Sequence, residues 1–162
     1  MNTNDNSDNP TGNLGRTYLK IRLKDAPVDC DSVIINLKEI RIKLAEDSTG
    51  ADSGWITLAT HAGFYDLLTL QNGVDTLISA SSVPTDTLQQ IRMILGDSNR
   101  VVVNGVSYAL TIPSGAESGL KINLGRLLNP TLDSLTIDFD AAASVHATGN
   151  DRYMLRPVLR VQ

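Results

Sequence analysis

The clearest pattern in the chain is a two-residue alternation of apolar and polar side chains. Within residues 17–24, Leu19, Ile21 and Leu23 alternate with lysine and arginine. Because successive side chains of a strand point to opposite faces, this period predicts a half-buried β-strand. Similar patterns predict further strands at 55–58, 76–80, 90–95, 119–124, 134–140 and 152–161.

The apolar residues of segment 33–44 change parity halfway along. They occupy the odd positions of 33–37 and the even positions of 40–44. A regular strand cannot bury both sets on one face. The slip at Lys38 and Glu39 therefore predicts a β-bulge, or a bend where the strand passes from one sheet to the other.

Turn formers divide these segments. Asn104 and Gly105, between two β-branched arms, predict a hairpin with a type I′ turn, because both residues accept positive φ. Segment 64–73 lacks clean alternation and predicts a short strand that continues into a helical turn, and 81–84 predicts a turn. Pro157 cannot donate to a strand ladder, so we expect an edge or irregular position there.

About eight or nine short strands, with no amphipathic helix longer than two turns, predict an all-β fold, an antiparallel Greek-key β-sandwich. Helix–strand alternation and internal repeats are absent, which argues against doubly wound sheets, propellers and solenoids. A chain of 162 residues fits one domain. We place this domain at 16–162 and expect the polar segment 1–15 to be a disordered tether.

A series of short motifs carries a resemblance to a known family. The motifs are LKDAP (23–27), WITL (55–58), YDLLTLQNG (65–73), QIRMIL (90–95), PSGAESGLK (113–121), IDFDA (137–141) and RYMLRPV (152–158). Together they resemble the bacterial domain-of-unknown-function family 4382, found mostly in exported and lipid-anchored proteins, from about Thr17 to Val161. The resemblance implies a prealbumin-like or carbohydrate-binding-domain-like sandwich and no established activity, so no site residues are carried over. Lys24 stands where the family often has threonine.

The N-terminal segment bears on the expected location. Residues 1–15 are similar to the tether that follows a lipoprotein acylation site, with Met1 added after truncation, and a frayed terminus is the alternative. We therefore expect an exported protein of the cell envelope or cell surface, with a lipid anchor in the full-length precursor. No stretch approaches the roughly 20 apolar residues of a membrane span.

The formal charge of −4 and the pI near 5.0 argue against nucleic-acid binding, which needs a basic surface to displace phosphate counterions. They also argue against docking on an anionic membrane surface. Outward positions on the predicted strands form a candidate basic face, for which a solvated sheet surface is the alternative. These positions are Lys20, Arg22, Lys24, Arg156 and Arg160.

The sequence contains no recognisable catalytic motif, so we expect a protein that is not an enzyme. His61 and His146 lie outside any nucleophile-elbow sequence. A hydrolytic site would need His146 within hydrogen-bonding distance of a serine and an aspartate. Cys30, the only cysteine, lies between Asp29 and Asp31, which disfavour the reactive thiolate.

Two groups of carboxylates are candidate ligands for a metal ion. Asp138 and Asp140 flank a buried aromatic residue at a strand end, and Asp25, Asp29 and Asp31 belong to a loop expected at the same end. Oxygen-rich loops suit Ca²⁺, although the spacing matches no EF-hand. The alternative is that these aspartates cap turns by accepting bonds from local backbone N–H groups. We therefore expect no cofactor, with Ca²⁺ as the alternative.

Segment 145–153 concentrates polar side chains that would suit a ligand. The candidate ligand-loop residues are His146, Asn150, Asp151 and Arg152. The alternative is a wide hairpin connection with Gly149 and Asn150 at its turn and with His146 holding the loop closed by a hydrogen bond.

These observations predict a non-catalytic binding or structural module with a protein or glycan partner at the cell surface. Edge strands would also allow self-association by strand addition. Aromatic residues form only 4% of the chain, which makes a flat sugar-binding platform hard to assemble. An exposed Trp55 sharing a face with Tyr18 or Tyr108 would favour a glycan-binding module, and a buried Trp55 would count against it.

Overall fold

The computed structural model describes residues 15–25, 30–45, 55–71, 73–112 and 119–162. In this part of the chain the backbone forms thirteen strands, one 3-10 turn and one single-turn helix. The predicted all-β sandwich is confirmed, with more strands than the expected eight or nine. No helix in the described ranges is long and apolar enough to cross a membrane.

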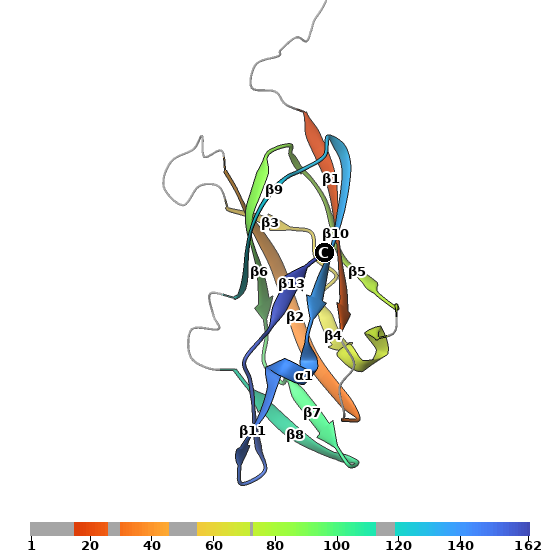
Figure 1. The fold of residues 1–162 in the computed structure, drawn as a ribbon, viewed down its shortest axis with the longest axis vertical. Helices are drawn as coiled ribbons and strands as arrows, with labels where there is room; N and C mark the ends of the chain where they lie inside the picture. The colour runs from red at the N-terminus through yellow and green to blue at the C-terminus, as the bar shows by residue number, and fades with distance from the viewer. Residues whose placement is uncertain (1–14, 26–29, 46–54, 72, 113–118) are drawn as a thin grey trace, which may run out of the picture.

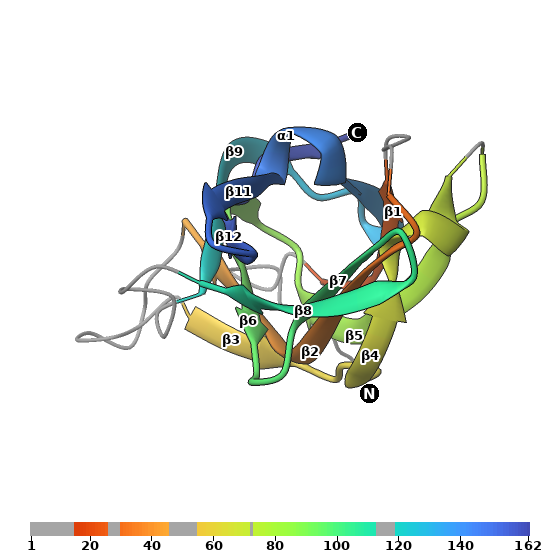
Figure 2. The ribbon, with the colours of Figure 1, turned by 90° about the horizontal axis from the view of Figure 1, so that it is seen from below.

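The strands form two sheets that face each other (Figures 1 and 2). The smaller sheet has the order β13 (Leu159–Val161), β10 (Thr131–Phe139), β1 (Arg16–Asp25) and β5 (Thr76–Pro84). The larger sheet has the order β11 (Val145–Gly149), β12 (Arg152–Leu155), β8 (Val106–Thr111), β7 (Arg100–Val103), β2 (Ser32–Leu44), β6 (Thr87–Leu95) and β9 (Leu120–Leu127). β3 (Trp55–Leu58) and β4 (Gly63–Asp66) also pair with β2, and η2 (Leu67–Leu70) follows β4.

Strand β2 is the spine of the larger sheet. Ile34 pairs with both β4 and β7, and Ile40 pairs with both β3 and β6, so two short strands follow one another along each of its edges. The register against β6 shifts between Leu37 and Glu39, which confirms the predicted bulge. Because of this extra residue, the odd apolar positions before it and the even ones after it are all buried.

Two of the ladders are parallel, where the alternation had suggested an antiparallel sandwich. β1 pairs with β10 in parallel from Thr17↔Thr131 to Asp25↔Phe139, and β8 pairs with β12 in parallel. A period of two is the same for both strand directions, so the sequence pattern contains no information on this choice.

The core lies between the two sheets and contains the inward residues of both. Phe139, Leu19, Ile91 and Ile137 are fully buried. The view along the long axis shows the β1–β10 side and the β6–β9 side around this common interior (Figure 2). The inward apolar residues of the alternating segments therefore all pack into this one core.

The predicted turns are correct in most cases. Asn104 and Gly105 have φ of 51° and 80° and connect β7 to β8, as a type I′ turn requires. The turn predicted at 81–84 is wrong, because these residues extend β5 along β1, and Pro84 is tolerated at the last position of this edge strand. Pro157 lies in the irregular link between β12 and β13, as expected.

Candidate functional site

The predicted ligand loop is a β-hairpin formed by β11 and β12. Its turn is centred on Asn150 and Asp151, with φ of 52° and 58°, one residue later than expected. The short polar side chains of these two residue types make the left-handed conformation accessible. The register shifts between Ala147 and Gly149, so Thr148 is an extra residue in the first arm.

A cleft of about 380 Å³ lies where this hairpin joins the larger sheet. The junction is a ladder of two residue pairs, Tyr153↔Leu110 and Met154↔Thr111. The cleft is lined by Ala109, Thr111, Thr148, Asp151, Arg152, Tyr153 and Met154. Two of the four predicted ligand-loop residues, Asp151 and Arg152, therefore line it, whereas His146 and Asn150 do not.

The walls of the cleft are held by contacts within the hairpin and to β8. The Thr111 hydroxyl donates to the Tyr153 carbonyl at 3.1 Å, and the Thr148 hydroxyl donates to the Arg152 carbonyl at 3.3 Å. The Tyr153 ring packs on the Tyr108 ring, with centroids 5.1 Å apart. These contacts fix a partly apolar wall beside an exposed carboxylate and guanidinium.

The charged groups at the cleft have no partner of opposite charge in the described part of the chain. Asp151 and Arg152 are both exposed, and neither takes part in an ion pair there. Both groups are therefore available to a ligand. An extended ligand would meet an apolar surface formed by Tyr153 and Met154 with one charge of each sign beside it.

His146 does not hold the hairpin closed, as one interpretation of the sequence required. It is exposed on β11 opposite Met154, and its ring forms no hydrogen bond with any residue that the structure describes. The neighbouring serine and aspartate that a hydrolytic site would need are likewise not bonded to it in these ranges. His61 lies elsewhere, between β3 and β4, with Nδ1 3.1 Å from the Leu77 carbonyl oxygen.

Two of the candidate metal-binding aspartates bond the start of α1 (Ala141–Ser144). Asp25 is 5% exposed, and its Oδ1 accepts from the Ala141 amide at 2.9 Å. Asp140 is the N-cap residue of α1 and accepts from the Ala143 amide at 3.0 Å. Arg160 lies 3.8 Å from the same carboxylate. These bonds match the capping role that was the alternative to metal binding.

The remaining candidate aspartates are spread over different elements. Asp31 accepts from the Gly105 amide at 2.7 Å, at the β7–β8 turn. Asp138 Oδ2 lies 3.5 Å from the Gln162 amide nitrogen. Asp29 lies outside the described residues. Within the described ranges, no three His, Cys, Asp or Glu side chains form a group that could hold a metal. The Ca²⁺ site stays a prediction.

The aromatic side chains do not form the platform that would favour a glycan-binding module. Trp55 is half-buried on the larger sheet, where the Arg92 guanidinium carbon lies 4.0 Å from its ring centroid. Tyr18 is exposed on the smaller sheet, and Tyr108 packs against Tyr153. The arrangement that would have favoured a glycan-binding module, an exposed Trp55 sharing a face with Tyr18 or Tyr108, is therefore not formed by these three rings.

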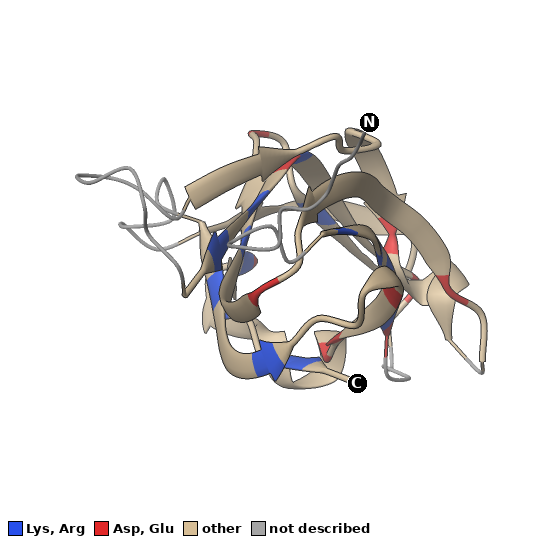
Figure 3. Cartoon of the chain, turned by 90° about the horizontal axis from the view of Figure 1, so that it is seen from above, with Lys and Arg blue, Asp and Glu red and all other residues tan. Residues whose placement is uncertain are grey.

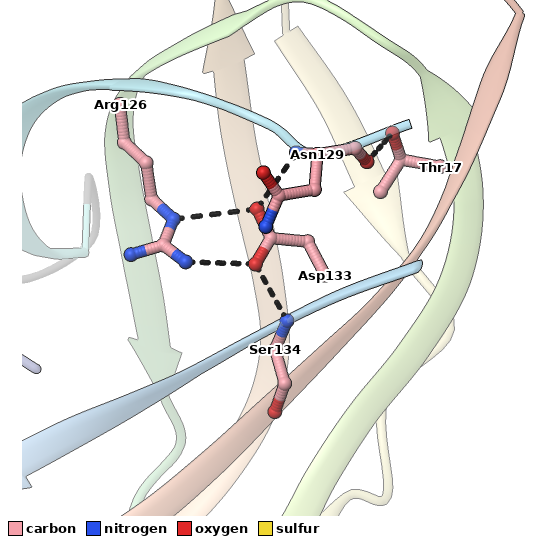
Figure 4. Close-up of polar contacts among 5 residues, drawn as sticks. All are labelled: Thr17, Arg126, Asn129, Asp133 and Ser134. Carbon is pink, nitrogen blue, oxygen red and sulfur yellow. Dashed lines mark hydrogen bonds and ion pairs between the residues drawn. The ribbon is translucent and has the colours of Figure 1, made fainter. Parts of the chain in front are cut away.

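A buried charged cluster, which the sequence pattern did not reveal, connects β9 to β10 (Figure 4). The side chain of Asp133 is 3% exposed, and Arg126 Nη2 donates to its Oδ1 at 2.7 Å. The backbone amides of Asn129 and Ser134 donate to the same carboxylate at 3.0 and 2.8 Å. The Thr17 hydroxyl continues the network to the Asn129 carbonyl at 2.8 Å.

The electrostatics of Asp133 identify this cluster as a structural one. Burial by itself would raise the pKa of the carboxyl, but the Arg126 guanidinium and the two backbone amides outweigh it and hold the pKa below its usual range. Both oxygens of the Asp133 carboxylate are bonded within the protein. The cluster therefore fixes the β9–β10 connection.

Comparison with known proteins supports the resemblance seen in the sequence. A family model described as a domain of unknown function (DUF4382) matches residues 16–157. No curated protein and no solved structure matches the chain. The cleft at the β11–β12 hairpin falls within the matched range.

Proposed function

This chain belongs to the DUF4382 family, and we propose from its own geometry that it is a non-catalytic binding module of the cell envelope. The observation that carries the proposal is the cleft between β8 and the β11–β12 hairpin. Its volume lies within the range of about 300–1,000 Å³ that is usual for ligand sites.

The cleft favours an extended polypeptide segment as the partner. Strand β8 pairs with β12 only at Leu110 and Thr111, so the backbone of residues 106–109 has no strand neighbour on the edge away from β7 in the described part of the sheet. An added strand would bond to this edge through its main chain. Its side chains would gain specificity from the apolar wall at Met154 and from the charges of Asp151 and Arg152.

The position of the hairpin suits a tethered module. Figure 1 shows the start of β1 at one end of the long axis and the β11–β12 hairpin at the other. A protein anchored through residues that precede β1 would present the hairpin away from the anchor. This geometry supports an exported, lipid-anchored protein that binds a partner at the cell surface.

The proposal is tested by selecting ligands from a random peptide library on the purified chain, with a glycan array beside it. The variant Ala109→Trp fills the cleft from the exposed side of β8, and Val106→Trp places the same ring on the same strand outside the cleft. We expect selected peptides to lose at least about tenfold in affinity, or about 1.4 kcal/mol, on Ala109→Trp only. Isothermal titration calorimetry measures the change.

Peptides that keep their affinity for Ala109→Trp, or a selection that yields no binder, would overturn the proposal. If the chain binds glycans and Ala109→Trp weakens that binding, glycans would replace peptides as the ligand class. Light scattering at increasing protein concentration checks whether a second copy of the chain is the partner, through the same edge of β8.

A further inference from the structure

The outer face of the larger sheet carries a row of cations across adjacent strands. In the register of the sheet, Arg41 on β2 lies opposite Arg92 on β6, and Arg92 lies opposite Lys121 on β9. Lys43 lies two residues after Arg41 on β2 and pairs with Trp55 on β3. We use the term basic face for the four cations together with three polar neighbours: Arg41, Lys43, Arg92, Lys121, Glu39, Gln90 and Asn123. Figure 3 shows blue segments following one another on neighbouring strands at the left of the view.

The alternation of each strand places these side chains outside. Ile40 and Ile42 on β2, and Ile91 and Met93 on β6, are buried in the core, so the residues between them point to the opposite side of the sheet. Arg41 has a side-chain exposure of 45%. The basic face thus lies on the outside of four paired strands.

The charges of this face are poorly compensated. Arg41 forms an ion pair with Glu39, whose carboxylate oxygen accepts from Nε at 2.8 Å. Within the described residues, Lys43, Arg92 and Lys121 form no ion pair with a carboxylate. Four cations and one carboxylate give the face a formal charge of +3, in a chain whose formal charge is −4.

Like charges directly opposite each other destabilise a sheet. Two such pairs follow one another here, Arg41↔Arg92 and Arg92↔Lys121. An anion lying across the three strands would remove this repulsion. The arrangement therefore favours a negatively charged ligand over an empty surface.

Arg92 is held in an orientation that leaves its outer nitrogens accessible. Its guanidinium stacks on the Trp55 ring at 4.0 Å, and its Nε donates to Gln90 Oε1 at 2.8 Å. Gln90 in turn donates to Asn123 Oδ1 at 2.6 Å. The two Nη groups have no partner in the described ranges. A planar guanidinium fixed in this way is suited to bidentate binding of a carboxylate or sulfate.

We propose that the basic face binds an anionic polysaccharide, with carboxylate or sulfate groups on its sugar units. Neighbouring strands of a sheet are spaced about 4.8 Å apart, so a row of cations across them suits a polymer with one charge per monomer rather than duplex DNA, which carries one charge per about 1.7 Å of helix axis. The amides of Gln90 and Asn123 and the hydroxyl of Thr57 surround the cations with partners for sugar hydroxyls. This site is separate from the hairpin cleft and goes beyond the peptide binding proposed above.

The test measures binding of the chain to polygalacturonate and heparin, with neutral dextran as the uncharged control. The double variant Arg92→Gln/Lys121→Gln removes two charges from the basic face. The double variant Lys20→Gln/Lys24→Gln removes the same charge from the smaller sheet. We expect binding to one of the two anionic polysaccharides that weakens by at least about tenfold in the first variant and by less than about twofold in the second. Thermal unfolding verifies that both variants fold.

Equal losses in both variants would show unspecific attraction and overturn the proposal, as would no binding to either anionic polysaccharide. Tighter binding to polyglutamate, to single-stranded DNA or to vesicles with anionic lipids would overturn it in favour of that class. Because the peptide cleft is untouched by these variants, the result is independent of the Ala109→Trp experiment.

Discussion

Arg126 and Arg92 lie on neighbouring strands of the same sheet, yet their guanidinium groups have opposite surroundings. Arg126 on β9 is bound to the buried carboxylate of Asp133, which also accepts two backbone amides. Arg92 on β6 faces two further cations and is bound to an aromatic ring and an amide side chain. One arginine completes a network within the protein, and the other belongs to a network that lacks an anion.

This difference separates a structural charge from a candidate binding group. If one member of the Asp133 cluster is removed, its former partners are left buried without a hydrogen bond. The cluster therefore stabilises the fold. The repulsion within a row of like charges costs about a few tenths of a kcal/mol for each opposed pair. The predictions below test this contrast, beginning with the largest expected effect.

Replacement of Asp133 by alanine is expected to lower the free energy of unfolding by about 3 kcal/mol. The substitution leaves Arg126 and the Asn129 and Ser134 amides without their acceptor. Asp138→Ala on the same strand is the control. Within the described residues its carboxylate has one long contact, to Gln162, and its Oδ1 is buried without a hydrogen bond, so the substitution should lower stability by less than about 0.5 kcal/mol. Urea unfolding followed by circular dichroism measures both, and equal effects would remove the distinction.

The two arginines are expected to differ when each is replaced by glutamine. Arg126→Gln should cost about 2 kcal/mol, because a buried carboxylate loses its counter-charge while Arg126 itself is partly exposed to water. Arg92→Gln should change stability by less than about 0.5 kcal/mol, because the lost cation–π contact and the relieved repulsion offset each other. A stability loss of similar size in both variants would indicate that Arg92 is structural as well.

The fold could be predicted from the sequence further than either charged site. Alternation places Leu19, Ile91 and Ile137 in the core, and the parity change at Lys38 gives the bulge, because both are local properties of a strand. The Arg126–Asp133 bond and the row through Arg92 depend on which strands are neighbours and in what register. One sequence does not contain that information in its local pattern.

The cleft at the β11–β12 hairpin could also be predicted only in part from the sequence. Its residue composition identified Asp151 and Arg152, which do line the cleft. The other wall, with Ala109 and Thr111, comes from β8, and its contribution follows from a parallel ladder of two residue pairs. No short-range signal marks that pairing, because about forty residues separate the two strands. The candidate basic face was predicted at Lys20, Arg22, Lys24, Arg156 and Arg160, four of which lie on the smaller sheet, with Arg156 in the link between β12 and β13. The row through Arg92 on the larger sheet was not predicted.

The stabilising role of Asp133 is expected to depend on pH in one direction. Its folded-state pKa is lowered, so the unfolded chain binds a proton more readily than the folded protein. The contribution is complete above the unfolded-state pKa of about 3.9 and is lost as the pH falls through the lower folded-state value. The difference in unfolding free energy between the wild type and Asp133→Asn should therefore be constant from neutral pH to about pH 5 and shrink below about pH 4. A difference that is constant down to pH 2 would contradict the assignment.

The smallest effect is expected at Lys121, where the substitution should increase the stability of the protein instead of lowering it. Lys121→Gln removes a charge opposite Arg92 without removing an ion pair, and the side chain is exposed on β9. We expect the free energy of unfolding to rise by about 0.3 kcal/mol at low salt, and the gain to disappear at about 1 M salt, where the screening length is about 3 Å. Denaturant unfolding at the two salt concentrations measures it, with Lys24→Gln on the smaller sheet as the control. A loss of stability at low salt would mean that Lys121 has a stabilising partner, and the repulsion along the basic face would then no longer argue for an anion.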